Sequence, residues 1–399
     1  MSRVTFSTNR ADALLRLHDF VPHAGRDYAS GRNTDFGPHV KNHVSQLSPY
    51  LRHRLITEKE VVAAVLRQHD MASAEKYVQE VLWRTYWKGW LEVRPDVWRR
   101  FCIERDLALQ TSFDAHAITA AENGLIGIEG FDDWARELVE TGYLHNHARM
   151  WFASIWIFTL RLPWTLGADF FLRHLIDADP ASNTLSWRWV AGLQTKGKTY
   201  LATTDNIARY TNGRFVPQGL AKSAVALTEV SSHTSHPIRE LQHYDDNAPA
   251  MLLVTHEDLN PESFISGEFK AACVATATHM LWGEKSAQFV QSAAMDTAQR
   301  IQSHYHCETR LSLSLDAESL LQIAEEFGVK QITTAYTPIG PVADVLSKAD
   351  PILEQSGITL SQTRRSWDTH FWPHAKKGFF AFKEQMVEGL ITEGVELKT

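Results

Sequence analysis

The chain has 399 residues, a formal net charge of −7 and three cysteines. This length suffices for two domains with substantial cores, and the negative charge excludes a generic polycation that coats nucleic acid, although it allows a local basic groove. Cys102, Cys273 and Cys307 are far apart, which argues against a disulfide framework and fits a reducing cytoplasm. Three thiols also cannot supply the four ligands of an iron–sulfur cluster.

The sequence predicts neither a membrane protein nor a metal protein. Residues 1–10 contain no apolar signal core, and the apolar run near 151–160 is too short to span a bilayer. The 19 histidines form no HExxH or comparable ligand spacing. We therefore expect a cytoplasmic protein without membrane contacts and without a bound metal.

The chain begins with a segment, 1–40, whose many turn-forming residues predict a loop-rich region. The following segment, 43–66, is predicted to be helical after Pro49. A proline at a helix start leaves backbone N–H groups free, and these favour an anion. A serine N-cap of the same helix is compatible with that interpretation.

Residues 73–98 are strongly helical in pattern. Tyr77, Glu80, Trp83 and Arg84 share one face of this helix by their spacing. The ordinary alternative is an amphipathic helix with a tryptophan in the core.

Residues 141–192 are the stretch around which we expect the chain to be organised, because apolar residues recur there at helical spacing and a few polar residues interrupt them. These residues are Asn146, Arg149, Asp177, Asp179 and Asn183, accompanied by Met150, Trp187 and Trp189. A buried carboxylate needs a cation or hydrogen-bond donors. The combination indicates a large, flat ligand with polar edges, although each residue alone is more typical of a core aromatic or a helix cap.

A basic segment follows at 186–222. It contains Arg188, Lys196, Lys198, Arg209, Arg214 and Lys222 against the single acid Asp205. This indicates a positive patch beside the expected site, although a solvated face would give the same composition.

Strand-like and helical patterns alternate from residue 250 onward, which predicts a parallel sheet covered on both faces. The strands are expected at 250–259, 272–281, 310–315, 330–337 and 358–364, and the helices at 284–301, 317–328 and 342–357. No GxGxxG fingerprint is present. We therefore expect a helical domain over 1–225, a linker over 226–248 and a Rossmann-like α/β domain over 249–399.

The segments EVLWR, TGYLHNHARM and DADPASNTLSWRW, in this order and spacing, resemble the helical FAD-binding domain of the DNA photolyase and cryptochrome family. The resemblance implies FAD as the cofactor. It implies that the diphosphate is bound by Ser45, Gln46, Leu47 and Ser48, and that the other cofactor-binding residues are Tyr28, Arg84, Arg149, Asp177, Asp179 and Asn183, with Asn183 facing flavin N5.

The same resemblance implies a pocket for a flipped-out DNA lesion. Its residues would be Tyr77, Glu80, Trp83, Asn146, Met150, Trp189 and Arg32. Asn146 and Met150 are typical of enzymes for cyclobutane pyrimidine dimers, whereas enzymes for the (6-4) photoproduct have histidines there. Glu80 would hydrogen-bond the dimer and stabilise charge on it. His147 stands where many members have a DNA-binding arginine.

For photoreduction, the resemblance implies electron transfer through Trp187 and then Trp164. The third, outer tryptophan of the family is missing, because 102–130 contains no Trp. Trp151, Trp156 or a tyrosine are the substitutes that the sequence offers.

In most of the family an antenna domain precedes the flavin domain. In this chain, LLVTHEDLNPES and KKGFFAFKEQM resemble parts of an antenna domain, and both segments follow the flavin-domain segments. This order resembles the short, permuted photolyases that act on single-stranded DNA. The implied function is that of a deoxyribodipyrimidine photo-lyase, a carbon–carbon lyase: photoexcited reduced FAD donates an electron to a flipped-out dimer, in DNA with UV lesions. We expect a monomer, and the sequence identifies no antenna chromophore.

Two other functions fit part of the sequence. A cryptochrome-like blue-light receptor would share the fold and the flavin, but it would not need Glu80, Trp83 and Met150 together. We also expect no long signalling tail after Thr399, which favours the enzyme. A non-catalytic binder of single-stranded nucleic acid would need only aromatic stacking and a basic groove.

Overall fold

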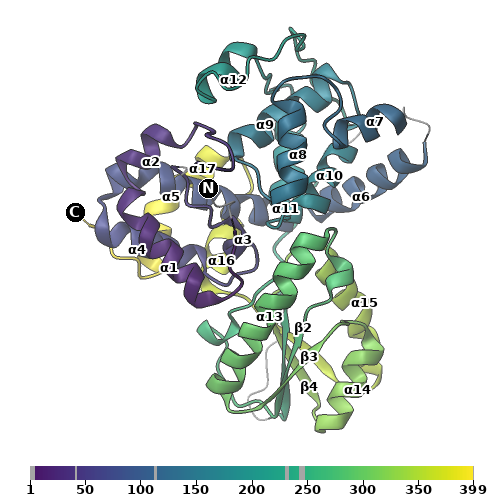
Figure 1. Cartoon of the computed structure of the whole chain (residues 1–399). Coiled ribbons are helices and arrows are strands. Elements are labelled where there is room, and N and C mark those ends of the chain that lie inside the picture. The colour runs from purple at the N-terminus through teal and green to yellow at the C-terminus, as the bar shows by residue number, and fades with distance from the viewer. Residues whose placement is uncertain (1–4, 41–42, 112–114, 230–232, 242–247, 399) are drawn as a thin grey trace.

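The computed structural model describes residues 5–40, 43–111, 115–229, 233–241 and 248–398 (Figure 1). Its N-terminal part is helical. The elements are α1 (Arg10–Phe20), η1 (Val21–His23), α2 (Arg26–Gly31), α3 (Ser48–Arg52), α4 (Glu58–Gln68), α5 (Met71–Glu92), α6 (Pro95–Gln110), α7 (Ala115–Glu122), α8 (Phe131–Thr141), α9 (Asn146–Ser154), the π-helical η2 (Ile155–Thr159), α10 (Trp164–His174), α11 (Pro180–Val190) and α12 (Thr204–Tyr210).

The prediction of a loop-rich region over 1–40 is wrong for α1, η1 and α2. Asn9 caps α1 by accepting a hydrogen bond from the backbone N–H of Asp12. Ala13, Leu17 and Phe20 then form the buried face of that helix. The cap and this apolar spacing outweigh the turn-forming residues farther along the segment.

Helix α5 is the centre of the helical part. It begins at an Asp70 cap that accepts from Ser73 N–H, and it contacts α2, α4, α6 and α11. Gly89 allows the backbone at Trp372 to lie close to α5, because a Cβ atom at position 89 would lie 2.8 Å from the Cα of Trp372. A larger residue at 89 would force the two backbones apart.

The C-terminal part contains a five-stranded parallel sheet with the order β3-β2-β1-β4-β5. The strands are β1 (Ala250–Thr255), β2 (Ala271–Ala275), β3 (Glu308–Ser312), β4 (Gln331–Ala335) and β5 (Thr359–Thr363). Every residue of β1, β2 and β4 is buried, as expected for inner strands covered on both faces. The predicted fold class, a helical N-terminal part followed by a parallel α/β part, is confirmed.

The two faces of the sheet belong to different cores. Leu252 and Val254 of β1 pack in one continuous core with α13 (Glu284–Tyr305) and the helical part. Met251 and Leu253, which alternate with them, pack under α14 (Ala317–Phe327) and α15 (Pro341–Gln355). The period of two along β1 therefore joins one sheet face to the N-terminal helices. The remaining short turns of this part are η3 (Pro261–Ser263) and η4 (Thr278–Met280).

After β5 the chain returns to the helical part. Its last elements are α16 (Ser366–Phe371), η5 (Trp372–His374), α17 (Phe379–Lys383) and α18 (Met386–Thr392). α16, η5 and α17 contact α5, and Figure 1 shows the yellow C-terminal segments among the purple N-terminal helices. The domain boundaries at 225 and 249 stay a prediction; residues after Thr363 add to the helical part.

A buried ion pair and a buried hydrogen bond join the two parts of the chain where the strand order of the sheet reverses. Glu257 and Asp258 follow β1, and Tyr336 follows the neighbouring β4. Arg52 donates two hydrogen bonds of 2.8 Å to Glu257, and Tyr336 donates one of 2.5 Å to Glu92 of α5. Carboxyl ends of strands at such a reversal form the usual ligand crevice of open α/β sheets. Side chains of the helical part occupy these positions here.

A second buried cluster lies beside the first one. Arg54 pairs with Asp368 at 2.7 Å and with Asp258 at 3.5 Å, and Arg365 donates two further bonds to Asp258, of 2.6 and 2.8 Å. All four side chains are at most 10% exposed, so each charge depends on its partners. Within the described ranges, no helix is long and apolar enough to cross a membrane.

Replacing Arg54 by Ala is expected to lower the free energy of unfolding by about 3–5 kcal/mol, because it leaves the buried Asp368 without its cation. Urea denaturation measures this change. Arg99→Ala is the matched control, since Arg99 pairs with Asp96 on the surface of α6 and exposed pairs contribute about 0–1 kcal/mol. Equal effects of the two substitutions would contradict the structural role of Arg54.

Candidate cofactor and lesion pocket

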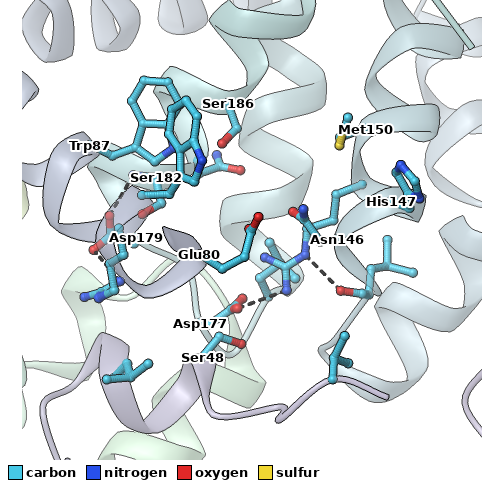
Figure 2. A pocket seen from close by; sticks show the side chains of 18 of the residues that line it. Ser48, Glu80, Trp87, Asn146, His147, Met150, Asp177, Asp179, Ser182 and Ser186 are labelled. Carbon is cyan, nitrogen blue, oxygen red and sulfur yellow. Dashed lines mark hydrogen bonds and ion pairs between the residues drawn. The ribbon is translucent and has the colours of Figure 1, made fainter. Parts of the chain in front are cut away.

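A cavity of about 560 Å³ opens among α2, α5, α9 and α11 and the chain before α3. Every residue predicted from the sequence to bind cofactor or substrate lines it, and so does Trp187. Trp164 is the one predicted site residue that does not line it. Figure 2 shows Glu80 near the centre of the view, with Asp179 to its left, Asp177 below it, and Asn146, His147 and Met150 of α9 to its right.

The first feature of the cavity is the pair Arg149 and Asp177. Arg149 donates from Nη2 to Oδ2 of Asp177 at 2.9 Å and from Nε to the Leu144 carbonyl at 3.0 Å. The second oxygen of Asp177, Oδ1, is buried without a protein hydrogen-bond partner. A buried carboxylate oxygen of this kind is a site where a ligand donor would be favourable.

Asp179 is completely buried and lies among three cations. Lys88, Arg84 and Arg52 approach its Oδ2 at 3.1, 3.5 and 3.8 Å. Burial alone would raise the pKa of Asp179, but these cations hold that pKa well below its ordinary value. The carboxylate therefore stays charged inside the cavity wall.

Asp179 also sets the start of α11. Its Oδ1 accepts the backbone N–H of Ser182 at 2.7 Å, and Pro180 occupies the first turn. Four residues on, Asn183 donates from Nδ2 to the Ala168 carbonyl at 2.8 Å. Trp187 follows after another four residues, so one helix face presents all three to the cavity. The Nε1 of Trp187 is buried without a hydrogen-bond partner.

Glu80 is paired with Arg32, whose Nη1 donates to Glu80 Oε1. Both side chains are about 30% exposed, so the pair faces the cavity opening. An unpaired carboxylate would repel a polyanion, and the guanidinium offsets that charge. Tyr28 lies beside the pair, where burial and the charge of Glu80 raise its pKa and keep it protonated.

On α9, Asn146 and Met150 are four residues apart and both reach the cavity. His147 lies between them, stacked on Trp151 with ring centroids 4.9 Å apart. Its Nδ1 donates to the Asn33 carbonyl at 2.7 Å. Burial lowers the pKa of His147, so the ring is neutral near pH 7 and offers no permanent charge to a phosphate.

Aromatic rings form one wall of the cavity. Trp83 contacts Trp87 at 5.0 Å and stacks face to face on Phe379 of α17, with centroids 3.7 Å apart and an angle of 8°. Sequence reasoning missed Trp87 and also Ser182 and Ser186, which line the cavity. Trp87 is four residues from Trp83, and Ser182 and Ser186 are four residues apart, so helical spacing was the available signal.

Trp187 and Trp164, the predicted electron-transfer pair, have no direct ring contact among the described residues. Trp187 instead contacts Trp156, with centroids 6.4 Å apart. Trp156 donates from Nε1 to the carbonyl of Pro163, next to Trp164. Gly167 makes this packing possible, because a Cβ there would lie 2.3 Å from Trp187.

Beyond Trp164 the aromatic contacts continue toward the sheet. Trp164 packs on Phe101 at 5.6 Å, Phe101 on Trp98 at 5.4 Å, and Trp98 on the half-buried Trp282 at 6.0 Å. Trp282 precedes α13, so this row of rings leads from the helical part into the sheet part.

The predicted basic patch over 186–222 is smaller than its composition indicates. Arg188 is buried and forms a bidentate pair with Glu229, at 3.0 and 2.6 Å, and Arg214 pairs with Asp35 at 2.7 Å. The inclusion of Arg188 was wrong because its partner lies outside the counted segment. The exposed cations of this segment are Lys196, Lys198, Arg209 and Lys222.

Comparison with known proteins bears on this cavity. Residues 77–219 match the family described as the FAD binding domain of DNA photolyase. The match confirms the family resemblance and the FAD prediction for this segment. It includes α9, α11 and the part of α5 from Tyr77 onward, which provide Glu80, Arg149, Asn183 and Trp187.

Curated relatives carry the name deoxyribodipyrimidine photo-lyase. The protein from Alkalihalophilus pseudofirmus is 32% identical over 47% of this chain and 39% of its own length. The one from Streptomyces griseus is 34% identical over 42% of this chain and 36% of its own. The one from Vibrio cholerae is 28% identical over 58% and 49%. The chain thus spans less than half the length of each of these relatives.

Among solved structures, a bacterial class III photolyase from Agrobacterium tumefaciens is 26% identical, with a TM-score of 0.42 over 52% of this chain and 44% of that one. A Synechocystis cryptochrome is 24% identical, with a TM-score of 0.41 over the same shares.

The cavity has the chemistry that FAD requires. The unpartnered Asp177 Oδ1 can accept a hydrogen bond and the Trp187 Nε1 can donate one, and both line the cavity beside the charged Arg149. By contrast, the described residues contain no group of three His, Cys, Asp or Glu side chains able to bind a metal ion.

A small acidic cluster adjoins the cavity behind Gln46 and Tyr143. Asp35, Glu137 and His145 line a void of about 10 Å³ there. Burial, together with the nearby Asp35, raises the pKa of Glu137 to about 8. Glu137 is therefore largely protonated at neutral pH.

This shift predicts a pH dependence of stability. Because the folded-state pKa is above the ordinary value of 4.5, Glu137 contributes stability below about pH 4.5 that is lost as the pH rises through about 8. As the pH rises from about 4.5 to about 8, the wild type should lose this stability and Glu137→Gln should not. The free energy of unfolding of the variant minus that of the wild type should therefore increase over this range. Urea denaturation at several pH values measures the difference. Glu318→Gln, exposed on α14, is the control; a constant difference for Glu137→Gln would refute the shift.

Proposed function

We propose that this protein is a deoxyribodipyrimidine photo-lyase that binds FAD in the cavity and repairs cyclobutane pyrimidine dimers in DNA under light. One observation supports this most strongly: a single cavity combines the Arg149–Asp177 pair and Asn183 with the Glu80–Arg32 pair, Asn146 and Met150. The first set suits a flavin and the second a flipped-out pyrimidine pair.

When bound, reduced FAD supplies the photoexcited electron. The chain's own residues orient the cofactor and the lesion and stabilise the charge that develops on the lesion. In this proposal the Arg149–Asp177 pair and Asn183 bind the ring edge, and Ser45 to Ser48 lie at the diphosphate. Trp83, Trp87 and Trp189 enclose the lesion and exclude water. Glu80, oriented by Arg32, hydrogen-bonds the pyrimidine edge, where charge accumulates during cleavage.

Single-stranded DNA is the proposed preferred substrate. Flipping a base out of a strand is least costly where no partner base must be displaced. The neutral His147 and the net charge of −7 provide little of the phosphate attraction that a duplex binder uses. We also propose a permuted domain order relative to typical photolyases, a monomer, and a cytoplasmic location.

The deciding experiment is blue-light repair by the chemically reduced, FAD-loaded protein. Matched single-stranded and duplex oligonucleotides with one thymine dimer are irradiated, and dimer loss is followed by chromatography. Repair that is faster on the single strand supports the proposal. No repair on either, with FAD bound and photoreducible, would refute it in favour of a photoreceptor; binding without any photochemistry would favour a non-catalytic binder.

Glu80→Gln should lower the repair yield per photon about tenfold, the effect of losing one charge-assisted hydrogen bond in the reaction. FAD absorbance of the purified variant should stay unchanged, because Glu80 lies on the lesion side. Glu75→Gln is the control on the same helix, where Glu75 pairs with Lys383 at the surface. A wild-type yield for Glu80→Gln would remove Glu80 from the mechanism.

For the electron route we propose that Trp156 connects Trp187 to Trp164. Trp187→Phe and Trp156→Phe should both slow photoreduction of oxidised FAD severalfold, while repair by chemically reduced protein persists. The rate under constant blue light with an external thiol measures this. Trp134→Phe is the control, a buried ring stacked on Trp151. If only Trp187→Phe and Trp164→Phe slow the reaction, Trp156 is not a member of the route.

A further inference from the structure

Helix α17 lies against the wall of the cavity. Phe379 covers one face of Trp83, which itself lines the cavity. Phe379 and Phe382 are 4% and 1% exposed and anchor this short helix in the core. α17 also contacts α5, the helix that provides Glu80, and Figure 1 shows it in yellow among the N-terminal helices. The C-terminal segment of the chain is therefore fixed next to the proposed lesion site.

The next residue, Phe380, points away from this core. Its side chain is 79% exposed, and its ring centroid lies 6.2 Å from that of Phe379 at an angle of 70°. It is the only exposed ring among the Phe, Tyr and Trp residues that the structure describes. Burying such a ring is worth roughly 1.5–3 kcal/mol, so the exposed face of Phe380 is available to a ligand that covers it.

Two lysines precede α17. The side chains of Lys376 and Lys377 are exposed, and neither forms an ion pair within the described ranges. Their backbones are fixed, because the carbonyl of Lys376 accepts from Arg94 at 2.7 Å and that of Lys377 accepts from the Tyr86 hydroxyl at 2.8 Å. Both ammonium groups are thus available on a rigid support, unlike Lys383, which pairs with Glu75.

We infer that Lys376, Lys377 and Phe380, here named the α17 rim, bind the single strand next to the lesion. This inference rests on the proposed function and extends it to the nucleotides outside the cavity. Phe380 stacks on an unpaired base, and the two lysines contact the adjoining phosphates. Exposed cations beside an exposed ring match the pattern of single-strand binding, where stacking and charge act together. Bases of an intact duplex are already stacked, so the rim favours single strands.

The test measures binding in the dark by the full-length, FAD-loaded protein. The probe is a labelled single-stranded oligonucleotide with a central thymine dimer, and fluorescence anisotropy gives its Kd. Phe380→Ala should weaken binding about tenfold, the effect of one lost base stack. The double variant Lys376→Ala with Lys377→Ala should lower the slope of log Kd against log salt concentration by about 1.4, since each single-strand phosphate contributes about 0.7.

Matched controls lie on the sheet part of the chain. Leu313→Ala removes a side chain that is 66% exposed, and Lys330→Ala with Lys348→Ala removes two exposed lysines. These variants should bind the oligonucleotide as the wild type does. A second probe, the isolated thymine-dimer dinucleotide, has no flanking strand, and the rim variants should bind it with wild-type affinity.

Three results would overturn the inference. The rim variants could bind the oligonucleotide as tightly as the controls do, or lose affinity equally for the dinucleotide, which would mean a damaged cavity. A third result would be that the rim variants bind a duplex oligonucleotide more weakly than the wild type does but bind the single strand normally, which would contradict a single-strand contact. Failure of the proposed function is distinguishable, because it appears in the wild type as absent repair, whichever way the rim variants bind.

Discussion

Asp179 is fully buried, and its carboxylate is stable there because Lys88, Arg84 and Arg52 surround it. Arg52 is just as buried and needs a further anion, which is Glu257 at the end of β1. Burial alone would raise the pKa of Glu257, yet Arg52 and Lys88 lower it to about 2. Charges of this kind are tolerated only as a complete set. The sheet part is therefore required for the electrostatics of the cavity.

This dependence explains the unusual use of the sheet. The carboxyl ends of β1 and β4, where an open α/β sheet ordinarily binds its ligand, contact Arg52, Arg54 and Glu92 instead. The return of the chain after β5 strengthens the same joint, since Arg365 and Asp368 complete the second cluster. Residues at the strand ends of the parallel sheet thus pair with side chains of the helical part and hold the wall of the cavity in place.

Helix α5 connects this support to the recognition of a ligand. One of its faces carries Lys88 into the buried charge cluster, and another presents Glu80 and Trp83 to the cavity. The Glu80 charge is balanced by Arg32 from α2, and the Trp83 ring is backed by Phe379 from α17. Segments from both ends of the chain therefore meet on one helix, where the electrostatic cost of an acid in the cavity is offset locally.

The sequence alone determined the local part of this description. Helical and alternating periodicities predicted the helical part and the parallel sheet, and spacings of three and four placed Asn146, Arg149 and Met150 on one face, because such patterns repeat within a single element. The role of each site residue remains a proposal. Tertiary structure alone decided the pairs Arg32–Glu80 and Arg52–Glu257, the contact of Trp187 with Trp156, and the stack of Phe379 on Trp83. Two of these pairs, Arg52–Glu257 and Phe379–Trp83, join residues more than 200 positions apart. Their meeting follows from packing, which no local pattern encodes.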